Sequence, residues 1–263
     1  MSDLPSQLLW LSLSALAAGI VNSVAGGGTL LTFAALLTVL APRGSEAGVL
    51  ANATSTVALV PGALAGAWGY RREMRAARRW TLLLLAPSVI GGAIGSLLLT
   101  EVDPKYFERL VPWLILTATL LFLFQPLMSR WTLSAKNTAG PPRQMVAAIV
   151  SFQFLVAIYG GYFGAGIGIL MLSALALMGL PGIHQMNAVK TFLNFCINGV
   201  SVVIFILKNK VEWNYALVMA LAAIVGGYLG ARVARRVPPY LVRWFVIAVG
   251  LGLAALYFAK QQS

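Results

Sequence analysis

Charged residues are scarce in this chain. Asp, Glu, Lys and Arg make up 10% of its 263 residues, against about 25% in soluble domains. The single cysteine, Cys196, excludes an internal disulfide and a cysteine-based metal cluster. The single histidine, His184, lies in a loop beside Pro181 and Gly182 without a carboxylate neighbour. We therefore expect His184 to be an interfacial residue rather than a catalyst or a metal ligand.

Motifs of the common enzyme and pump classes are also absent. The sequence has no G-x-x-x-x-G-K-[ST] phosphate loop, no dinucleotide fingerprint, no Ser–His–Asp set and no metal-ligand cluster. We therefore expect no cofactor, no bound metal, no catalysis and no ATP-driven pumping by this chain alone.

Acidic residues are few, and their positions are informative. The seven carboxylates all lie in expected loops or at the ends of apolar segments: Asp3, Glu46, Glu73, Glu101, Asp103, Glu108 and Glu212. Proton relays and many cation sites inside membranes use a buried Asp or Glu. Their absence from the middle of every segment disfavours a cation as substrate.

Hydrophobic residues, by contrast, make up 59% of the chain. Stretches of about 20 residues without charge are typical of transmembrane helices. The net charge of +12 comes from Lys and Arg in short loops, where such residues set membrane orientation, so we expect no nucleic-acid partner. The opening MSDLPSQ has no Lys or Arg and does not resemble a cleaved signal peptide. We expect an all-α, multi-pass protein in the lipid bilayer of the inner (plasma) membrane.

Ten apolar segments divide into two sets of five around a polar linker. The first set covers residues 8–24, 29–40, 47–70, 80–99 and 106–128, and the second covers 145–163, 167–180, 186–207, 213–233 and 240–259. The linker, 129–144, contains a Gly-Pro-Pro run that marks a loop. We expect a first repeat at 1–128, a cytoplasmic linker at 129–144 and a second repeat at 145–263.

An internal repeat relates the two sets. Four motifs recur in the same order: A-G-x-G at 25–28 and 165–168, N-A-x-x-T at 52–56 and 187–191, G-G-x-x-G at 91–95 and 226–230, and V-x-P at 102–104 and 237–239. Glycine is common in membrane helices, but its abundance alone does not explain four matches in one order.

Equivalent loops of the two sets carry opposite charge bias. The loop at 71–79 contains five arginines, whereas its counterpart KNKVE at 208–212 is barely basic. The loop with Glu101 and Asp103 corresponds to one with Arg232, Arg235 and Arg236. Because cytoplasmic loops collect Lys and Arg, we expect equivalent loops on opposite sides of the membrane. The two sets are then inverted repeats.

Each inverted repeat must cross the membrane an odd number of times. It crosses five times if its first two segments both span the membrane, and three times if they form a re-entrant pair. Both options place the two termini outside, and the 71–79 loop and the linker inside. A layout of eight helices with both termini inside is the weaker alternative, because it leaves the arginines of 232–236 outside.

Two glycine-rich stretches interrupt the first segments of each set. They read GIVNSVAGGGTLL at 19–31 and YGGYFGAGIGILM at 159–171. Three glycines at 26–28, and three within five residues at 164–168, disfavour a continuous helix and allow close approach of a ligand or another backbone. Broken apolar segments at matching positions in two halves indicate a transporter's binding site. The alternative is that these glycines only allow helices to pack closely.

A new helix should begin after each glycine cluster, and its N-terminus carries about half a positive charge. Polar residues of the third segment of each set are expected to complete the site at these helix N-termini. Asn187, Lys190, Asn194 and Asn198 share one helix face by their spacing. Lys190 is expected to be a fixed cation for an anion, unless it extends to the membrane interface. Our candidate substrate-binding residues are Asn22, Gly26, Gly27, Gly28, Thr29, Asn52, Ser55, Thr56, Gly164, Gly166, Gly168, Asn187, Lys190, Thr191 and Asn194.

The chain resembles the TauE/SafE family of sulfite and organosulfonate exporters. The resemblance is carried by both glycine-rich stretches, by ANATST and NAVKTFLNFCINGVSVVIF, and by the tail WNYALVMALAAIVGGYLGARVARRVPP. It covers nearly the whole chain except the central linker. It implies export of sulfur-containing anions, most specifically sulfite or an organosulfonate.

We therefore expect a secondary transporter with a small anion as its partner. An anion channel of the same architecture and a carrier for another small solute are the alternatives. A membrane-embedded enzyme is disfavoured by the missing catalytic groups, and a receptor-like protein would not need paired breaks. The sequence is compatible with a homo-oligomer and leaves the oligomeric state open.

Overall fold

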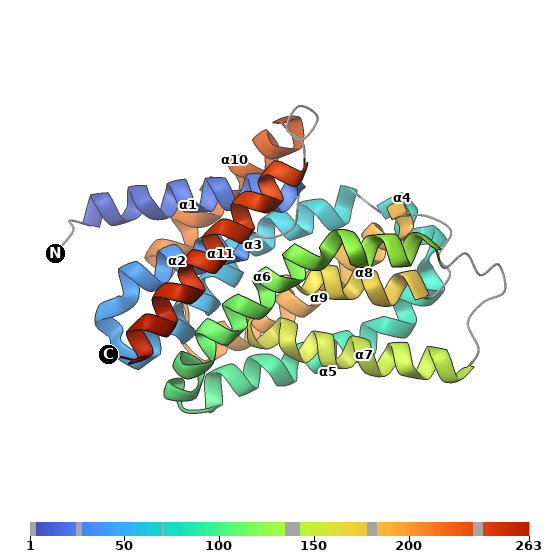
Figure 1. Cartoon of the computed structure of the whole chain (residues 1–263), viewed down its shortest axis with the longest axis horizontal. Coiled ribbons are helices and arrows are strands. Elements are labelled where there is room, and N and C mark those ends of the chain that lie inside the picture. Colours follow the sequence, from blue (N-terminus) through green and yellow to red (C-terminus); the bar gives the residue numbers. More distant parts are fainter. Residues whose placement is uncertain are drawn as a thin grey trace.

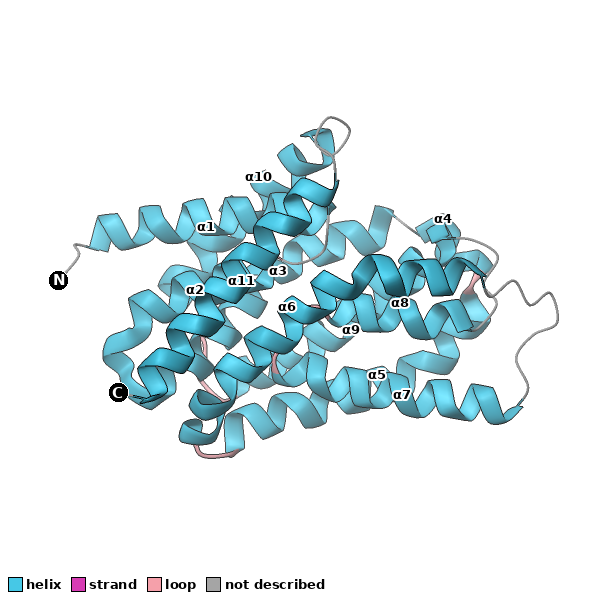
Figure 2. Cartoon of the chain, viewed as in Figure 1, coloured by secondary structure: helices cyan, strands magenta, loops and turns pink. Residues whose placement is uncertain are grey.

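The protein is described by a computed structural model that covers residues 4–24, 28–69, 71–134, 143–177, 183–233 and 239–262. All regular structure in these residues is helical (Figure 2). The predicted all-α class is thereby confirmed.

The helices follow the ten expected segments closely. The first half contains α1 (Leu4–Val24), α2 (Thr29–Leu40), α3 (Ala47–Gly69), α5 (Arg78–Glu101) and α6 (Pro104–Ser134). The second half contains α7 (Arg143–Tyr162), α8 (Ile167–Leu177), α9 (Ile183–Leu207), α10 (Trp213–Val233) and α11 (Pro239–Gln262).

Two stretches expected as loops also form helical turns. The first is the 3-10 helix η1 (Ala41–Glu46), in which Gly44 takes φ of 61° to turn the chain into α3. The second is α4 (Arg71–Ala76), which carries Glu73 in its first turn, where the helix dipole favours a carboxylate. Neither was predicted from the sequence, because both stretches are short and polar and lack the apolar periodicity of a long helix.

Helix length separates two classes of element. Within the residues that the structure describes, six stretches are long and apolar enough to cross a membrane: Leu4–Asn22, Thr29–Leu64, Arg78–Glu101, Pro104–Phe124, Gln144–Tyr162 and Gln185–Leu207. Trp213–Leu229 and Arg243–Ala259 are shorter apolar stretches. The helices α2 and α8 have 12 and 11 residues, which gives lengths of about 18 and 16 Å. Neither can alone cross a hydrocarbon core of about 30 Å.

Each short helix packs beside the helix that precedes it, α2 on α1 and α8 on α7. Long helices then cover both pairs. The helix α10 packs along α1, α5 packs along α7, α11 packs along α6, and α3 packs against α9 (Figure 1). Most of these contacts join one half of the chain to the other.

Glycine allows the closest of these approaches. A Cβ atom added at Gly95 of α5 would collide with the carbonyl oxygen of Ile158 on α7, and one at Gly226 of α10 would collide with that of Leu16 on α1. Gly95 is the last glycine of the first G-G-x-x-G motif, and Gly226 is the first glycine of the second. Small residues at helix contacts let two helices approach closely and gain dispersion energy. This matters in a membrane because lipid is as apolar as leucine, so there is no hydrophobic driving force between the helices.

Buried polar side chains also join the helices. The Ser96 hydroxyl on α5 donates to Ser201 Oγ on α9 at 2.7 Å, and the Gln153 amide on α7 donates to Ser88 Oγ on α5 at 2.9 Å. Hydrogen bonds of this kind contribute about 0.6 kcal/mol each on average in membranes. They hold α5 in register with α7, the helix that leads into the second break, and with α9.

Candidate functional site

The first break connects α1 to α2. Its candidates Gly26 and Gly27 lie outside the described residues, whereas Gly28 is described and buried. The Gly28 N–H donates to Asn22 Oδ1 at 2.8 Å, so the side chain of Asn22 holds the two helix ends together. A Cβ atom at Gly28 would collide with the Ala18 carbonyl oxygen, which explains why this position is glycine.

The helix α2 then contacts α3 through buried hydroxyl groups. Thr29 is partly buried at the start of α2. One turn later, Thr32 Oγ1 lies 2.6 Å from Ser55 Oγ, and both residues are fully buried. The polar groups beside the first break are thus neutral and paired with one another.

The second break connects α7 to α8 and has a different geometry. Gly164 and Gly166 both take φ of 77°, a conformation that residues with a Cβ atom rarely adopt. The Tyr159 hydroxyl donates to the Ala165 carbonyl at 2.7 Å and so holds the turn from α7. Tyr159 was not among the predicted site residues. The available signal was its hydroxyl, because a hydroxyl inside an apolar run must find a hydrogen-bond partner.

The helix α3 belongs to the first half of the chain but also reaches the second break. Asn52 is 1% exposed, and its Nδ2 donates to the Tyr162 carbonyl at 3.1 Å across 110 residues of sequence. Its Oδ1 is buried without a hydrogen-bond partner. The Thr56 hydroxyl, in contrast, donates within α3 to the Asn52 carbonyl at 2.8 Å. Asn52 is therefore the α3 side chain that meets this break.

The helix α9 brings a cation to the second break. A Cβ atom at Gly168, the second residue of α8, would lie 3.3 Å from Lys190 Cδ, so this glycine makes room for the lysine stem. Lys190 Nζ donates to Asn187 Oδ1 at 3.0 Å, and Asn198 Nδ2 donates to Asn194 Oδ1 at 3.4 Å. These bonds confirm the shared polar face of α9. Its residues, including Thr191, are partly buried.

The electrostatics of the second break favour an anion. The positive end of the α8 dipole and the Lys190 side chain beside Gly168 lie together. The carboxylate side chains in the described part of the chain are all at least partly exposed, with Glu73 Oε2 of α4 as a single buried oxygen among them, and these residues contain no group of three metal-ligating side chains. A negatively charged ligand would therefore meet positive potential at the start of α8.

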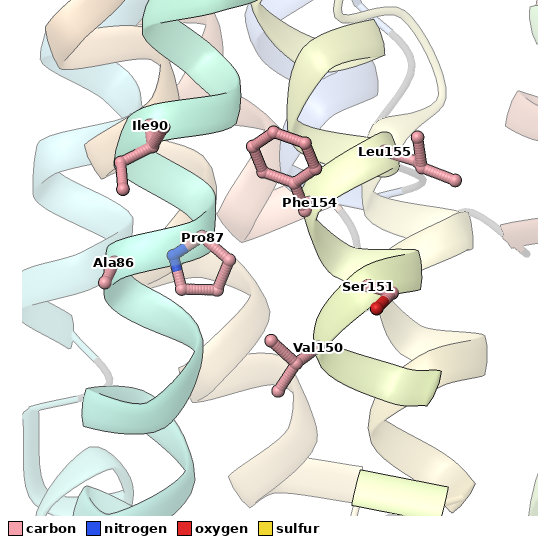
Figure 3. A pocket seen from close by; sticks show the side chains of 7 residues that line it. All are labelled: Ala86, Pro87, Ile90, Val150, Ser151, Phe154 and Leu155. Atoms are coloured by element: carbon pink, nitrogen blue, oxygen red, sulfur yellow. The ribbon is translucent and has the colours of Figure 1, made fainter. Parts of the chain in front are cut away.

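A groove of about 520 Å³ lies elsewhere, between α5 and α7. Figure 3 shows its seven lining residues, among them Pro87, Ile90 and Phe154. The lining is almost wholly apolar, with Ser151 as its one hydroxyl, and contains none of the candidate site residues. Ligand orientation needs a few convergent polar groups, so we place the candidate site at the breaks.

Comparison with known proteins identifies the family of the chain. A family model described as sulfite exporter TauE/SafE matches residues 11–257. The chain belongs to the TauE/SafE family. The resemblance read from its sequence motifs is thereby confirmed.

Curated relatives of the TauE/SafE chain carry transporter names. A probable membrane transporter protein of Haemophilus influenzae is 28% identical over 90% of this chain and 89% of its own length. Another, from Sinorhizobium sp, is 28% identical over 97% and 94%. The probable membrane transporter protein YfcA of Escherichia coli K12 is 27% identical over 92% and 86%. No solved structure matches the chain.

The chain is thus a multi-pass membrane protein and a membrane transporter of the TauE/SafE type. Its relatives are named as transporters and not as enzymes.

Proposed function

We propose that this transporter moves a small oxyanion, most specifically sulfite or an organosulfonate, and binds it at the second break. The observation that carries the proposal is the position of Lys190 against Gly168 at the start of α8. A lysine ammonium and a helix N-terminus both bind anionic oxygen atoms. The family description names sulfite, which fits this chemistry.

The remaining candidate residues have supporting parts in this proposal. Asn187 orients the Lys190 ammonium through its Oδ1, and Asn52 contacts the C-terminal end of α7 from the opposite half. Gly164 and Gly166 permit the turn. Thr191 and Asn194 continue the polar face of α9 beside Lys190 and are partly buried. Asn22, Gly28, Ser55 and Thr56 belong to the first break and to α3, where their hydrogen bonds hold α1, α2 and α3 of the first half together.

The same proposal includes two inverted repeats. Helix packing supports them, because exchanging the halves reproduces the contacts: α1 on α10 corresponds to α7 on α5, α3 on α10 to α9 on α5, and α2 on α11 to α8 on α6. Because α2 and α8 are too short to cross alone, each forms a re-entrant pair with α1 or α7 in this proposal, although the α1 and α7 stretches are themselves long enough to cross. The remaining three long helices of each repeat then cross the membrane. The start of α1 and the end of α11 lie at one end of the molecule (Figure 1), as odd crossing numbers in inverted repeats require.

The proposed driving force is the membrane potential. Each carboxylate in the described residues lies in a turn, in a short helix or near a helix end, and not in the middle of a long helix. An inside-negative potential contributes about 2.3 kcal/mol per elementary charge per 100 mV, and at 1.4 kcal/mol per tenfold ratio this sustains a gradient of roughly fortyfold for a monovalent anion. Export across the inner (plasma) membrane needs no sodium or proton gradient in this scheme.

The experiment is sulfite efflux from proteoliposomes under a potassium–valinomycin potential, with sodium absent and pH equal on both sides. We expect saturable efflux that increases with the imposed potential. Flux that never saturates would favour the channel alternative. Flux that ignores the potential and requires a sodium or pH gradient would contradict the driving force, and no anion flux in any condition would contradict the proposed function.

A further inference from the structure

Three ion pairs join the two halves of the chain at one end of the molecule. Arg43 Nη2 of η1 lies 2.9 Å from Glu212 Oε1, and Lys210 Nζ lies 2.8 Å from Glu46 Oε1 of η1. Lys208 pairs with Glu101 at the end of α5. One short turn, 208–212 between α9 and α10, therefore binds both η1 and the end of α5.

This turn is also anchored to the buried part of α3. The Glu212 backbone N–H donates at 3.1 Å to Oγ1 of Thr54, a residue that is fully buried and lies two positions from Asn52. The Lys210 ammonium lowers the pKa of Glu46 from its ordinary value through a hydrogen bond and its charge. The carboxylate therefore stays ionised and paired at neutral pH.

An aromatic cluster fills the space between these ion pairs and the second break. Phe163, directly after α7, packs edge-to-face on Phe33 of α2 with ring centroids 5.1 Å apart, and Phe107 of α6 packs on Phe33 at 6.4 Å. All three rings are at most 2% exposed. Phe107 also meets Gly48 at the start of α3, next to η1. The cluster thus extends from the break to the paired end.

The polar side chains of α9 are less buried than those of α3. The polar side chains of α9 at Asn187, Lys190 and Asn194 are partly exposed, whereas those of α3 at Asn52, Thr54 and Ser55 are fully buried. The first turns of α9 lie toward the end of the molecule that carries α4 (Figure 1). The polar groups of α3 below the ion-paired end are therefore enclosed, whereas Lys190 and its neighbours on α9 keep part of their surface exposed.

We propose that the three ion pairs and the aromatic cluster are the two layers of a gate, closed in this structure. The gate must open for the substrate to exchange between the second break and the ion-paired end. This inference rests on the proposed transport through that break. The loop charges place the ion-paired end outside the cell, so the structure represents an inward-facing or occluded state.

The test is the rate at which a charged maleimide labels a Thr54→Cys reporter. The protein is held in lipid nanodiscs at low ionic strength, in a Cys196→Ser background that removes the native free thiol. The variant Arg43→Gln/Glu101→Gln/Lys210→Gln removes one partner from each ion pair. Each exposed pair contributes about two- to threefold to an equilibrium, so we expect labelling to be about tenfold faster. No substrate is needed, so failure here is distinct from failure of the proposed function.

Two further variants make the result specific. The double reversal Glu46→Lys/Lys210→Glu keeps a pair of opposite charges, so its labelling should stay near that of the parent reporter. Arg75→Gln/Arg78→Gln/Arg79→Gln neutralises three arginines at the other end of α3 and α5 and should leave labelling unchanged. If the first triple variant does not fold, the parent reporter is labelled in about 0.1 M and then 1 M salt, which reduces the screening length from about 10 to 3 Å.

An increase in labelling with neutralisation or salt, absent from the arginine control, supports the gate. Labelling that stays slow in the triple variant and in 1 M salt would overturn the gate. The ion pairs would then only hold the 208–212 turn against η1 and the end of α5. Equal acceleration by the arginine control would also overturn it, because general destabilisation would then explain the exposure of Thr54.

Discussion

The two glycine-rich breaks of this transporter correspond in sequence but differ in how their polar groups are satisfied. At the first break, Asn22 Oδ1 accepts the Gly28 N–H, and Ser55 pairs with Thr32. At the second break, two glycines take positive φ, and Lys190 lies against the first turn of α8. One break is closed by neutral groups of the chain, whereas the other has a cation beside a helix N-terminus.

The repeated N-A-x-x-T motif shows where this difference arises. It aligns Asn52 with Asn187 and places Ser55 at the position of Lys190. A duplicated scaffold thus supplies two helix ends, and a change at one position leaves a fixed charge at only one of them. We infer that the second break binds the substrate and the first holds the fold.

The largest effect is expected from Gly166→Leu. A side chain at φ of 77° costs about 1–2 kcal/mol and would face Leu121 and the Ala118 carbonyl. Sulfite flux in proteoliposomes should be abolished while folded protein is still recovered. Gly252→Leu is the matched control, because no atom lies within 4 Å of a Cβ atom added there. Normal flux in Gly166→Leu would reduce the second break to a packing element.

A smaller effect is expected from Lys190→Ala. Loss of a charged hydrogen bond costs about 1.5–3 kcal/mol, so apparent sulfite affinity in the flux assay should fall roughly tenfold to a hundredfold. Lys190→Arg should rescue it only in part, because a planar guanidinium does not replace a compact ammonium. The exposed Lys105 provides the control Lys105→Ala. Unchanged affinity would assign Lys190 to the membrane interface.

Tyr159→Phe should have an intermediate effect, mainly on stability. It removes the donor to the Ala165 carbonyl and leaves that carbonyl unpaired, at a cost of about 1–3 kcal/mol. We expect a lower thermal midpoint and a modest fall in maximal flux, with sulfite affinity retained. A selective loss of affinity would instead mean that the hydroxyl contacts the substrate.

The smallest effect on transport is expected at the first break. Asn22→Ala removes the acceptor of the Gly28 N–H, which resembles the loss of a helix cap and should cost about 1 kcal/mol of stability. Sulfite affinity measured by flux should not change. If Asn22→Ala weakened affinity as much as Lys190→Ala, the two breaks would share the substrate and the distinction between them would fail.

Much of this architecture could be predicted from sequence, because long apolar segments and repeated glycine motifs are local signals. The helix bounds, the breaks and the shared face of Asn187, Lys190 and Asn194 followed from spacing alone. The contact of Asn52 with Tyr162 did not, since it joins residues 110 positions apart through packing between the halves. The bond from Glu212 to Thr54 was hidden for the same reason.

The most direct measurement is thermal stabilisation of the purified protein by sulfite, in the parent and in the variants Lys190→Gln and Asn22→Ala. Ligand at a hundred times its dissociation constant stabilises a folded protein by about 2.7 kcal/mol. We predict that sulfite raises the thermal midpoint of the parent and of Asn22→Ala by the same amount and leaves that of Lys190→Gln unchanged. An equal increase in Lys190→Gln, or its loss in Asn22→Ala, would contradict the assignment of the anion to the second break.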